Sequence, residues 1–478
     1  MKKHGLALLL TVLLLFSLGG CNGTQGEDSD KADNDDPGVR TFADWTDIES
    51  FQTVPAMIVA DTKIGSAVDY GGKDYVIDID GTDLEDYQAY LQTLEENGFK
   101  KYVDNGTEGL DGAVYTSTFT KDTLVVTVTQ LVSCFKTYIS VCDGLALSPN
   151  LLYNDSYVAD NVDGAKTTLH MQELYDNGNS FLIQLKNGHF IMNDGGRAED
   201  LPYLLDYMES LVPEGEKPVV DAWFISHAHD DHVGWIKSMV SDTSYIDRIC
   251  VEAFYFSQPS SAISVAFGTT DVQNFMINYQ FLNNSEGNAP ELYRPQTGQR
   301  YYFDDITVDV VFAQEQLTID NYSGDFNDSS TWLMYTIEGQ KFLLCGDAEF
   351  GSVKAVMHTY DSEYFNLDLY AVFHHGINVY DYFTDYCTLK TILYPNYRCG
   401  SLHAGNEWER KEANAHLISV AEEAIAWGKG TVVLSFPYEV GTARIMPATK
   451  WVYNPESPTY TGTRVDEYET YIINKKGE

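Results

Sequence analysis

The sequence predicts an α/β fold, a layered sandwich of sheets and helices preceded by a small α+β domain. Two observations lead to this fold class. Residues 41–149 contain one helical segment among alternating strands, whereas strands and helices follow one another along residues 150–478. Because strands from both halves of the longer region are followed by helices, we expect its sheets to be layered with helices. A chain of 478 residues is long enough for two or three domains with cores of their own.

The small domain is predicted to place one helix on an antiparallel sheet. The helix begins after Asp83, an N-capping residue, and ends at Gly98. Strand patterns occupy residues 73–79, 112–119, 123–132 and 136–142. Since this domain contains no cluster of ligand-type side chains, we expect it to serve packing, spacing or partner binding rather than chemistry.

The larger domain is predicted to begin with several closely spaced strands and to continue with alternating strands and helices. Hairpin turns are predicted at Lys186–Gly188 and at Glu338–Gly339. Residues 241–320 mix helix and loop and give no clear assignment. Strands are expected within residues 167–174, 180–194, 218–226, 331–347, 367–376, 389–395 and 430–436, and helices at 350–360 and 407–428.

The N-terminus predicts a lipid anchor. Lys2 and Lys3 precede the apolar segment Leu6–Leu18, which has the length of a signal-peptide core. LGGC then resembles the bacterial lipoprotein pattern, in which Cys21 carries lipid such as palmitate. The alternative is a plain secretory signal with a chance cysteine. We therefore expect a signal peptide at residues 1–21, a disordered tether at 22–40, and a lipid-anchored, extracytoplasmic protein at the cell membrane.

Charge limits the partners of the chain. It has 71 acidic and 30 basic residues and a net charge of -41. Such a surface repels phosphate backbones, so no nucleic-acid partner is expected, and a small-molecule substrate is. Six cysteines remain beside Cys21 without any C-x-x-C spacing, and Cys345 is expected in the core.

The stretch ISHAHDDHVG places three histidines and two aspartates within six positions, directly after an apolar strand. His227 and His229 are two apart in an extended loop, so both imidazoles point to one side. Asp231 and His232 follow where the chain turns. Four such donors suit Zn²⁺ better than they suit a polar turn.

This motif fits an H-x-H-x-D-H signature, and from about residue 162 the chain resembles the metallo-β-lactamase fold superfamily of metallo-hydrolases. The resemblance includes FIMNDGG, with Asp194 before two glycines, then FLLCGDAE and AVFHHGI, in the order typical of that family. It implies a four-layer αββα sandwich over residues 150–478.

The resemblance also implies roles for single residues. His227 and His229 resemble ligands of a first metal, Asp231 and His232 resemble ligands of a second, and Asp347 resembles the carboxylate that bridges both. His375, which precedes a glycine, resembles the last ligand of the second site. His374 is the alternative, because neighbouring residues at a strand end are expected to point in opposite directions.

The chain departs from the family at one ligand. No histidine occurs between His232 and His358, where the family completes its first site. NDSSTWLMY stands there instead, and together with HHG it resembles the branch formed by the external hydrolase domain of bacterial DNA-uptake channel proteins. Asn327, Asp328 or water would then complete the first site, although Asn327 fits a loop cap equally well.

Asn327 is also a candidate for substrate binding, and His416 is a second. It lies four residues after Glu412 on the predicted helix, so the two share a face. The alternative is a solvated Glu–His pair on the helix surface. Asn414 is expected to point elsewhere.

The resemblance implies a metal-dependent hydrolase in which a metal-bound hydroxide attacks a carbonyl or phosphoryl centre and Asp231 orients the water. One or two Zn²⁺ ions are expected, with Mn²⁺ as the alternative metal. The substrate is expected to be a small phosphodiester, ester or lactone. The alternative function is a non-catalytic surface lipoprotein that binds a wall polymer or glycan.

Overall fold

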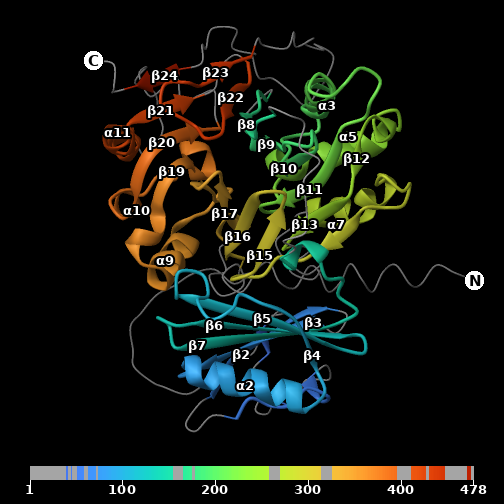
Figure 1. Ribbon diagram of the computed structural model, residues 1–478, viewed down its shortest axis with the longest axis vertical. Helices are drawn as coiled ribbons and strands as arrows, with labels where there is room; N and C mark the ends of the chain where they lie inside the picture. The colour runs from blue at the N-terminus through green and yellow to red at the C-terminus, as the bar shows by residue number, and fades with distance from the viewer. Residues whose placement is uncertain are drawn as a thin grey trace, which may run out of the picture. The chain divides into compact units, whose positions relative to one another are not determined.

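The computed structural model describes residues 39–40, 45, 51–58, 63–71, 74–153, 165–174, 178–257, 270–313, 326–395, 411–426, 430–446 and 471–474. Their strands form sheets of seven, nine and eight members. One group of helices lies beside the nine-stranded sheet and another beside the eight-stranded sheet (Figure 1). The first group is α3 (Leu201–Glu209), α5 (Trp235–Ser241) and α7 (Asp271–Asn278), and the second is α9 (Phe350–Thr359), α10 (Asp381–Thr384) and α11 (Lys411–Val420). The predicted fold class is therefore confirmed.

The seven-stranded sheet is antiparallel throughout, in the order β1-β2-β3-β7-β6-β5-β4. The predicted strands are present as β3, β5, β6 and β7, and β1, β2 and β4 join them. Their bounds are β1 (Val39–Arg40), β2 (Lys63–Gly71), β3 (Asp74–Asp80), β4 (Lys100–Asp104), β5 (Val114–Lys121), β6 (Leu124–Leu131) and β7 (Lys136–Asp143).

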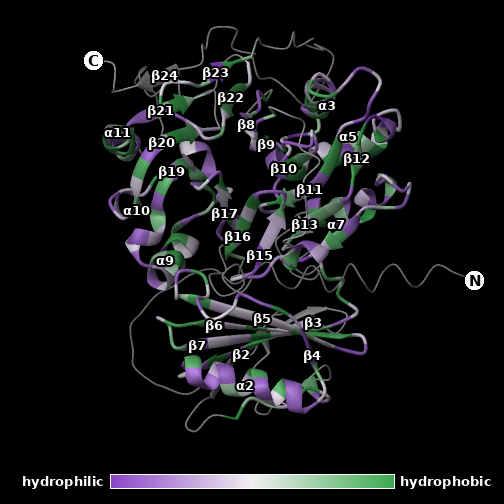
Figure 2. Cartoon of the chain, in the orientation of Figure 1, coloured by the Kyte–Doolittle hydropathy of each residue, from purple (hydrophilic) through white to green (hydrophobic). Residues whose placement is uncertain are grey.

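Helix α2 (Leu84–Glu96) begins where its cap predicts. The Asp83 carboxylate accepts hydrogen bonds from the backbone N–H groups of Glu85 and Asp86, and the Asp86 carboxylate accepts one from the N–H of Asp83. Tyr87, Tyr90 and Leu94 are buried, and hydrophobic and hydrophilic bands alternate along the helix in Figure 2. The helix thus packs through one apolar face.

The nine-stranded sheet has the order β14-β13-β11-β10-β9-β8-β22-β23, with β12 beside β11. Strands β9 and β10 form the predicted hairpin, and Gly188 in its turn has φ 88°. The bounds are β8 (Thr168–Met171), β9 (Ser180–Gln184), β10 (Phe190–Asp194), β11 (Val219–Ile225), β12 (Cys250–Val251), β13 (Ala253–Phe256), β14 (Glu291–Tyr293), β22 (Val432–Ser435) and β23 (Arg444–Ile445).

The eight-stranded sheet has the order β15-β16-β17-β18-β19-β20-β21-β24. Its predicted hairpin turns at Glu338 and Gly339, which both have positive φ, 50° and 78°, as a two-residue turn between twisted strands requires. The bounds are β15 (Arg300–Phe303), β16 (Ile306–Phe312), β17 (Trp332–Ile337), β18 (Gln340–Leu344), β19 (Asn366–Ala371), β20 (Thr388–Tyr394), β21 (Glu423–Ala426) and β24 (Tyr471–Asn474).

The two larger sheets pack face to face. The Phe181 and Phe342 rings, one from each sheet, lie 5.8 Å apart, and the Tyr335 hydroxyl donates to Asn193 Oδ1 at 2.5 Å. Within the sheets, β10 runs parallel to β11 and β18 runs parallel to β19. Each parallel pair therefore brings its carboxyl ends to one edge, where ligand-type side chains follow the strands.

The predicted helix at residues 407–428 is wrong at its C-terminal end. Helix α11 ends at Val420, and Glu423–Ala426 forms β21 between β20 and β24. Glu and Ala favour helices, but tertiary pairing overrides that preference. The buried Glu423 carboxylate accepts hydrogen bonds from Thr391 Oγ1, the Tyr438 hydroxyl and the Gly441 N–H.

The seven-stranded sheet shares contacts with the rest of residues 37–478, which form one compact unit. Thr116 Oγ1 donates to the carbonyl of Thr297 at 2.8 Å. A Cβ added to Gly298 would lie 2.0 Å from Thr116 Oγ1, so only glycine fits there. Leu131 packs into the same apolar cluster as Phe312. The boundary at residues 149/150 stays a prediction.

Cys345 is buried, as expected. The described cysteines, Cys134, Cys142, Cys250, Cys345 and Cys387, are all free thiols. Cys21 lies outside the described residues, so lipidation stays a prediction. In the described part of the chain, no helix has both the length and the apolar character needed to cross a bilayer.

His170 makes stability depend on pH. Its buried ring bonds Thr168 Oγ1 and the Tyr207 hydroxyl, both at 2.7 Å, and burial lowers the pKa of His170 to about 3. Between pH 6.5 and 3 the unfolded chain binds a proton here that the folded chain does not, so stability falls as pH falls. When pH falls from 7 to 5, the free energy of unfolding should decrease by about 2 kcal/mol less in His170→Gln than in the parent. Urea unfolding of the metal-free protein at both pH values measures this difference.

His189→Gln is the matched control. The bond from His189 to Asp221, at 2.8 Å, raises the pKa of His189. That contribution is present at low pH and is lost as pH rises, so this variant should lose more stability at pH 5 than at pH 7. An unchanged pH slope in His170→Gln would contradict the assignment to His170.

Candidate metal centre

The motif HAHDDH lies directly after β11. His227 and His229 stand in the loop, His229 caps the short helix α4 (Asp230–Val233), and Asp231 and His232 lie on that helix. His227 Nε2 and His229 Nδ1 are 3.0 Å apart. The two imidazoles therefore face one point, as their spacing predicts.

Asp347 follows β18 and meets this motif through Gly346. Gly346 has φ 53°, and a Cβ on it would lie 2.7 Å from the Cβ of Ser226. The Gly346 carbonyl also accepts a hydrogen bond from the N–H of His374, at 3.0 Å. Loops from both large sheets are thereby joined at one glycine.

Four side chains converge into a buried cluster: Asp231, His232, Asp347 and His375, each with one ligand atom within 4.8 Å of the others. His232 Nε2 lies 3.1 Å from Asp347 Oδ1. His375 Nε2 lies 3.3 Å from Asp347 Oδ2 and 3.3 Å from Asp231 Oδ2. The structure thus brings together all the residues that the family resemblance assigned to the second metal.

Protonated histidines balance the negative charge of the carboxylates within the cluster. Burial lowers the pKa of His375, but Asp347 and Asp231 together raise it to about 9. Burial also lowers the pKa of His232, but the carboxylates of Asp347, Asp194 and Asp231 raise it well above its usual range. Burial raises the pKa of Asp347, and His232 and His375 hold it well below its usual range. Two imidazolium protons therefore balance two carboxylates, and a divalent cation would supply the same charge.

The donor set fits a metal ion. Imidazole nitrogens and carboxylate oxygens are ligands that Zn²⁺ accepts, and the cluster offers two of each. His232 Nε2 is buried, and among the described residues its contact with Asp347 Oδ1, at 3.1 Å, lacks hydrogen-bond geometry. Burial and the neighbouring imidazoles of His232 and His229 lower the pKa of His227 well below its usual range, so His227 is present in the neutral form that ligates metals.

Asp194 holds His232 in place. Its carboxylate accepts hydrogen bonds from His232 Nδ1, the Ser226 N–H and Ser226 Oγ, each at 2.8 Å, and from Asn179 Nδ2 at 2.9 Å. The hydrogen on Nδ1 fixes the tautomer and leaves Nε2 to face Asp347. The aspartate before the double glycine is therefore a positioning residue.

The prediction that His374 and His375 point in opposite directions is wrong. Strand β19 ends at Ala371, and both histidines have left-handed backbones, with φ of 49° and 53°. The alternation of an extended strand no longer applies to them. His374 Nε2 lies 3.6 Å from Asp347 Oδ2, the oxygen that His375 also faces.

Asn327 and Asp328 lie near the cluster but differ in direction. Asn327 Nδ2 donates to Glu349 Oε1 at 3.1 Å. Asp328 turns toward α9, where its carboxylate accepts hydrogen bonds from the N–H and Oγ of Ser352. Asp328 therefore acts as a cap of α9 rather than as a member of the cluster.

His416 is not brought to the cluster. Its Nε2 lies 2.7 Å from Asp385 Oδ1, on a part-exposed face of α11. Its substrate-binding role stays a prediction. Asn414, two residues earlier, is buried, donates to the Gly376 carbonyl at 2.8 Å and accepts from the Tyr394 hydroxyl at 3.0 Å.

Asn414 thus supports the HHG loop, a role that sequence reasoning missed. The signal was present, because the apolar residues Ala413 and Leu417 mark the inner face of α11 and Asn414 lies beside them. Arg197 was missed too. Its Nη1 lies 3.1 Å from Asp230 Oδ2 and its Nη2 lies 3.7 Å from Asp231 Oδ2.

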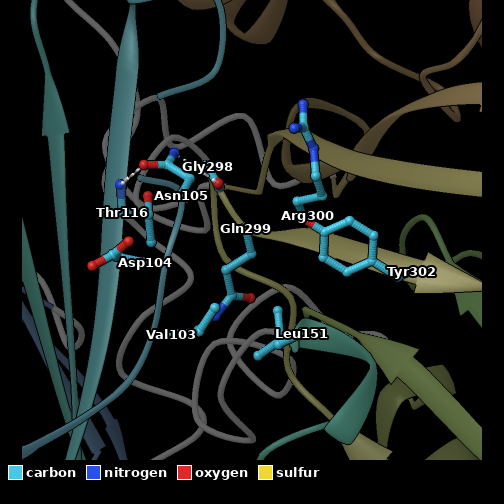
Figure 3. Close-up of a pocket in the computed structure, with 9 residues that line it drawn as sticks. All are labelled: Val103, Asp104, Asn105, Thr116, Leu151, Gly298, Gln299, Arg300 and Tyr302. Carbon is cyan, nitrogen blue, oxygen red and sulfur yellow. Dashed lines mark hydrogen bonds between the residues drawn. The ribbon is translucent and has the colours of Figure 1, made fainter. Parts of the chain in front are cut away.

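A small cleft of about 80 Å³ lies away from these residues (Figure 3). It opens between the seven-stranded sheet and β15, and its Arg300 guanidinium is paired with Asp309. The lining residues are Val103, Asp104, Asn105, Thr116, Leu151, Gly298, Gln299, Arg300 and Tyr302. None belongs to the metal cluster, so the cleft fits a packing seam better than a reaction site.

Comparison with known proteins agrees with this geometry. Residues 175–379 match the model of the metallo-beta-lactamase superfamily, and this span contains every member of the cluster. No curated protein shows significant similarity to the chain. The nearer resemblance to the DNA-uptake branch stays a prediction.

Two solved structures are similar to parts of the chain. A Cronobacter sakazakii metallo-beta-lactamase with a HARLDQ motif is 13% identical, over 51% of this chain and 85% of that one, with a TM-score of 0.27. A metallo beta lactamase from Hirschia baltica is 13% identical, over 35% of this chain and 58% of that one, with a TM-score of 0.20. Similarity this low adds no weight, and the assignment rests on the family match. Residues 175–379 belong to the metallo-beta-lactamase superfamily.

Proposed function

We propose that the chain is a metal-dependent hydrolase of small organic substrates. The superfamily match supports a hydrolase of this kind. The single observation that carries the proposal is the buried cluster of Asp231, His232, Asp347 and His375. Buried charges of this density are found where a metal or a reaction requires them.

Those four residues would hold one ion, and His227 with His229 would face another. Imidazole and carboxylate donors together favour Zn²⁺, with Mn²⁺ as the alternative. Such an ion polarises a carbonyl or phosphoryl oxygen and lowers the pKa of water to about 7.

Asp231 is the residue of the cluster that a substrate can reach. Its side chain is 18% exposed, whereas those of His232, Asp347 and His375 are 0%, 4% and 2% exposed. Arg197 lies between Asp230 and Asp231 and limits the movement of the Asp231 carboxylate. We assign Asp231 to orienting the attacking water and accepting a hydrogen bond from it.

The substrate is proposed to be a small phosphodiester, ester or lactone with an apolar part. A net charge of -41 disfavours long polyanions. Phe350 follows Glu349, whose carboxylate lies 3.5 Å from His374 Nδ1. The Phe350 ring is 50% exposed and packs edge-on against Tyr382, itself 38% exposed. Exposed aromatic rings that follow a residue in contact with His374 favour a substrate with an apolar face.

The location of the protein is also a proposal. LGGC at residues 18–21 supports lipidation of Cys21, and a polar segment follows it. The hydrolase would then act on the outer face of a bacterial membrane, with the lipid as its only membrane contact.

Asp231→Ala should abolish hydrolysis. We expect a loss of at least about 10²-fold in kcat, because the variant lacks both a ligand of the cluster and the acceptor for the water. The measurement is turnover of bis(p-nitrophenyl) phosphate, p-nitrophenyl acetate and a simple lactone by the Zn²⁺- or Mn²⁺-loaded soluble form, with metal content determined in parallel.

Asp230→Ala is the matched control, since Asp230 pairs with Arg197 and Lys237 and lies outside the cluster. It should keep its metal and lose less than about tenfold in kcat. Equal activity of Asp231→Ala and the parent would refute the role of Asp231. A parent that binds metal tightly but hydrolyses nothing in a broad panel would favour the non-catalytic binding protein.

Phe350→Ala tests the apolar part of the substrate. We expect KM for an aromatic ester to rise about three- to tenfold while kcat changes little, because one ring contact contributes about 0.5–1.5 kcal/mol. Phe135→Ala removes a ring that is 61% exposed in the turn between β6 and β7, and it should leave KM unchanged. Equal KM values in parent and Phe350→Ala would remove Phe350 from the substrate site.

A further inference from the structure

The half of the centre built on His227 and His229 lacks a ligand in the sequence. Their facing nitrogens, 3.0 Å apart, offer two donors. The Asp347 carboxylate would offer a third if it bridged both sites, as the family resemblance implies. No histidine occurs between His232 and His358. A site with these three donors can take one more protein ligand and still admit a water, because Zn²⁺ can expand to five ligands.

His374 stands beside the shared carboxylate. Asp347 Oδ1 faces His232 at 3.1 Å, and Oδ2 faces both His375 at 3.3 Å and His374 at 3.6 Å. The second site is already complete with His375. The His374 imidazole, which faces the same Asp347 oxygen as His375, is therefore not needed as a ligand of the second site.

The backbone of the HHG loop is built to present both rings. His374 and His375 have φ, ψ of 49°, 45° and 53°, 21°. A left-handed conformation costs about 1–2 kcal/mol for each residue other than glycine. Two such residues in succession persist only where surrounding contacts enforce them. The Gly346 carbonyl bonds the His374 N–H, and Asn414 bonds the Gly376 carbonyl.

The other nitrogen of His374 is held by polar side chains. His374 Nδ1 lies 3.5 Å from Glu349 Oε1 and 2.8 Å from Asn378 Nδ2. Glu349 Oε1 is in turn bonded by Asn378 Nδ2 at 2.9 Å and by Asn327 Nδ2 at 3.1 Å. Nδ1 therefore has an amide nitrogen and a carboxylate beside it. Metal binding through Nε2 requires the hydrogen on Nδ1, and Glu349 is then the carboxylate placed to accept that hydrogen.

We propose that His374 is the missing ligand of the first metal, and that Glu349 positions it. The first site then consists of His227, His229, His374 and the shared Asp347, and it takes a divalent transition metal such as Zn²⁺. Asn327, where the sequence would otherwise carry a ligand, holds Glu349 instead. This inference rests on the proposed function, since it adds a second ion to the same centre.

Metal stoichiometry tests the inference without any substrate. The metal-free soluble form is titrated with Zn²⁺ against a chromophoric chelator, and metal content is measured after dialysis. We expect two ions for the parent, one for His374→Ala, and one for His375→Ala, which loses the other site. Glu349→Gln should keep two ions but weaken one of them about 10–100-fold.

Two further variants keep the result interpretable. His374→Gly accepts the left-handed backbone without strain, so it separates loss of a ligand from loss of the loop, and it should also bind one ion. His358→Ala removes an exposed histidine of α9 and should bind two ions.

Two results would overturn the inference. His374→Gly with two ions of parental affinity would show that His374 is no ligand. If the parent and His374→Gly each bind one ion with the same affinity, His374 is likewise no ligand. The proposed hydrolase would then have a single-metal centre. A parent that binds no ion would instead refute the proposed function itself.

Discussion

Two carboxylates meet at one point, the buried Asp347 and the part-buried Asp231, and this approach is the constraint on which the centre depends. Carboxylates that approach a common set of imidazoles away from water require positive charge beside them. His232 and His375 meet that need as imidazolium groups, because the carboxylates raise the pKa values of both rings. A divalent ion can replace these two protons, so metal binding and proton release are linked at this centre.

This charge cluster forms because loops from two separate sheets can approach closely. Asp194 ends one strand, Ser226 follows the parallel strand beside it, and Asp347 follows a strand of the other sheet. Gly346 closes the gap, since any side chain there would collide with Ser226. The hydrophobic contact between the sheets is broad, but the position of the reacting groups depends on this one narrow approach.

Local patterns predicted the parts of the protein that local chemistry decides. Asp83 capped its helix, the Glu338–Gly339 turn closed its hairpin, and HAHDDH followed a buried strand. The sequence could not show that Glu423–Ala426 pairs as a strand, because β20 and β24 impose that conformation from elsewhere in the chain. Nor could it show that His374 and His375 share one direction, since no sequence rule places two left-handed residues before a glycine.

The HHG loop also shows that the centre extends beyond the span that matches the superfamily. That span ends at residue 379, whereas Asn414, which bonds the Gly376 carbonyl, and Tyr394, which bonds Asn414, come later in the chain. Without the Asn414 amide, the Gly376 carbonyl would lose a buried hydrogen bond, and the left-handed pair before it would lose part of its support. The reach of His374 and His375 toward Asp347 therefore depends in part on α11, a helix outside the family match. Differences in this later segment between related chains would thus alter the metal centre while every motif residue stayed the same.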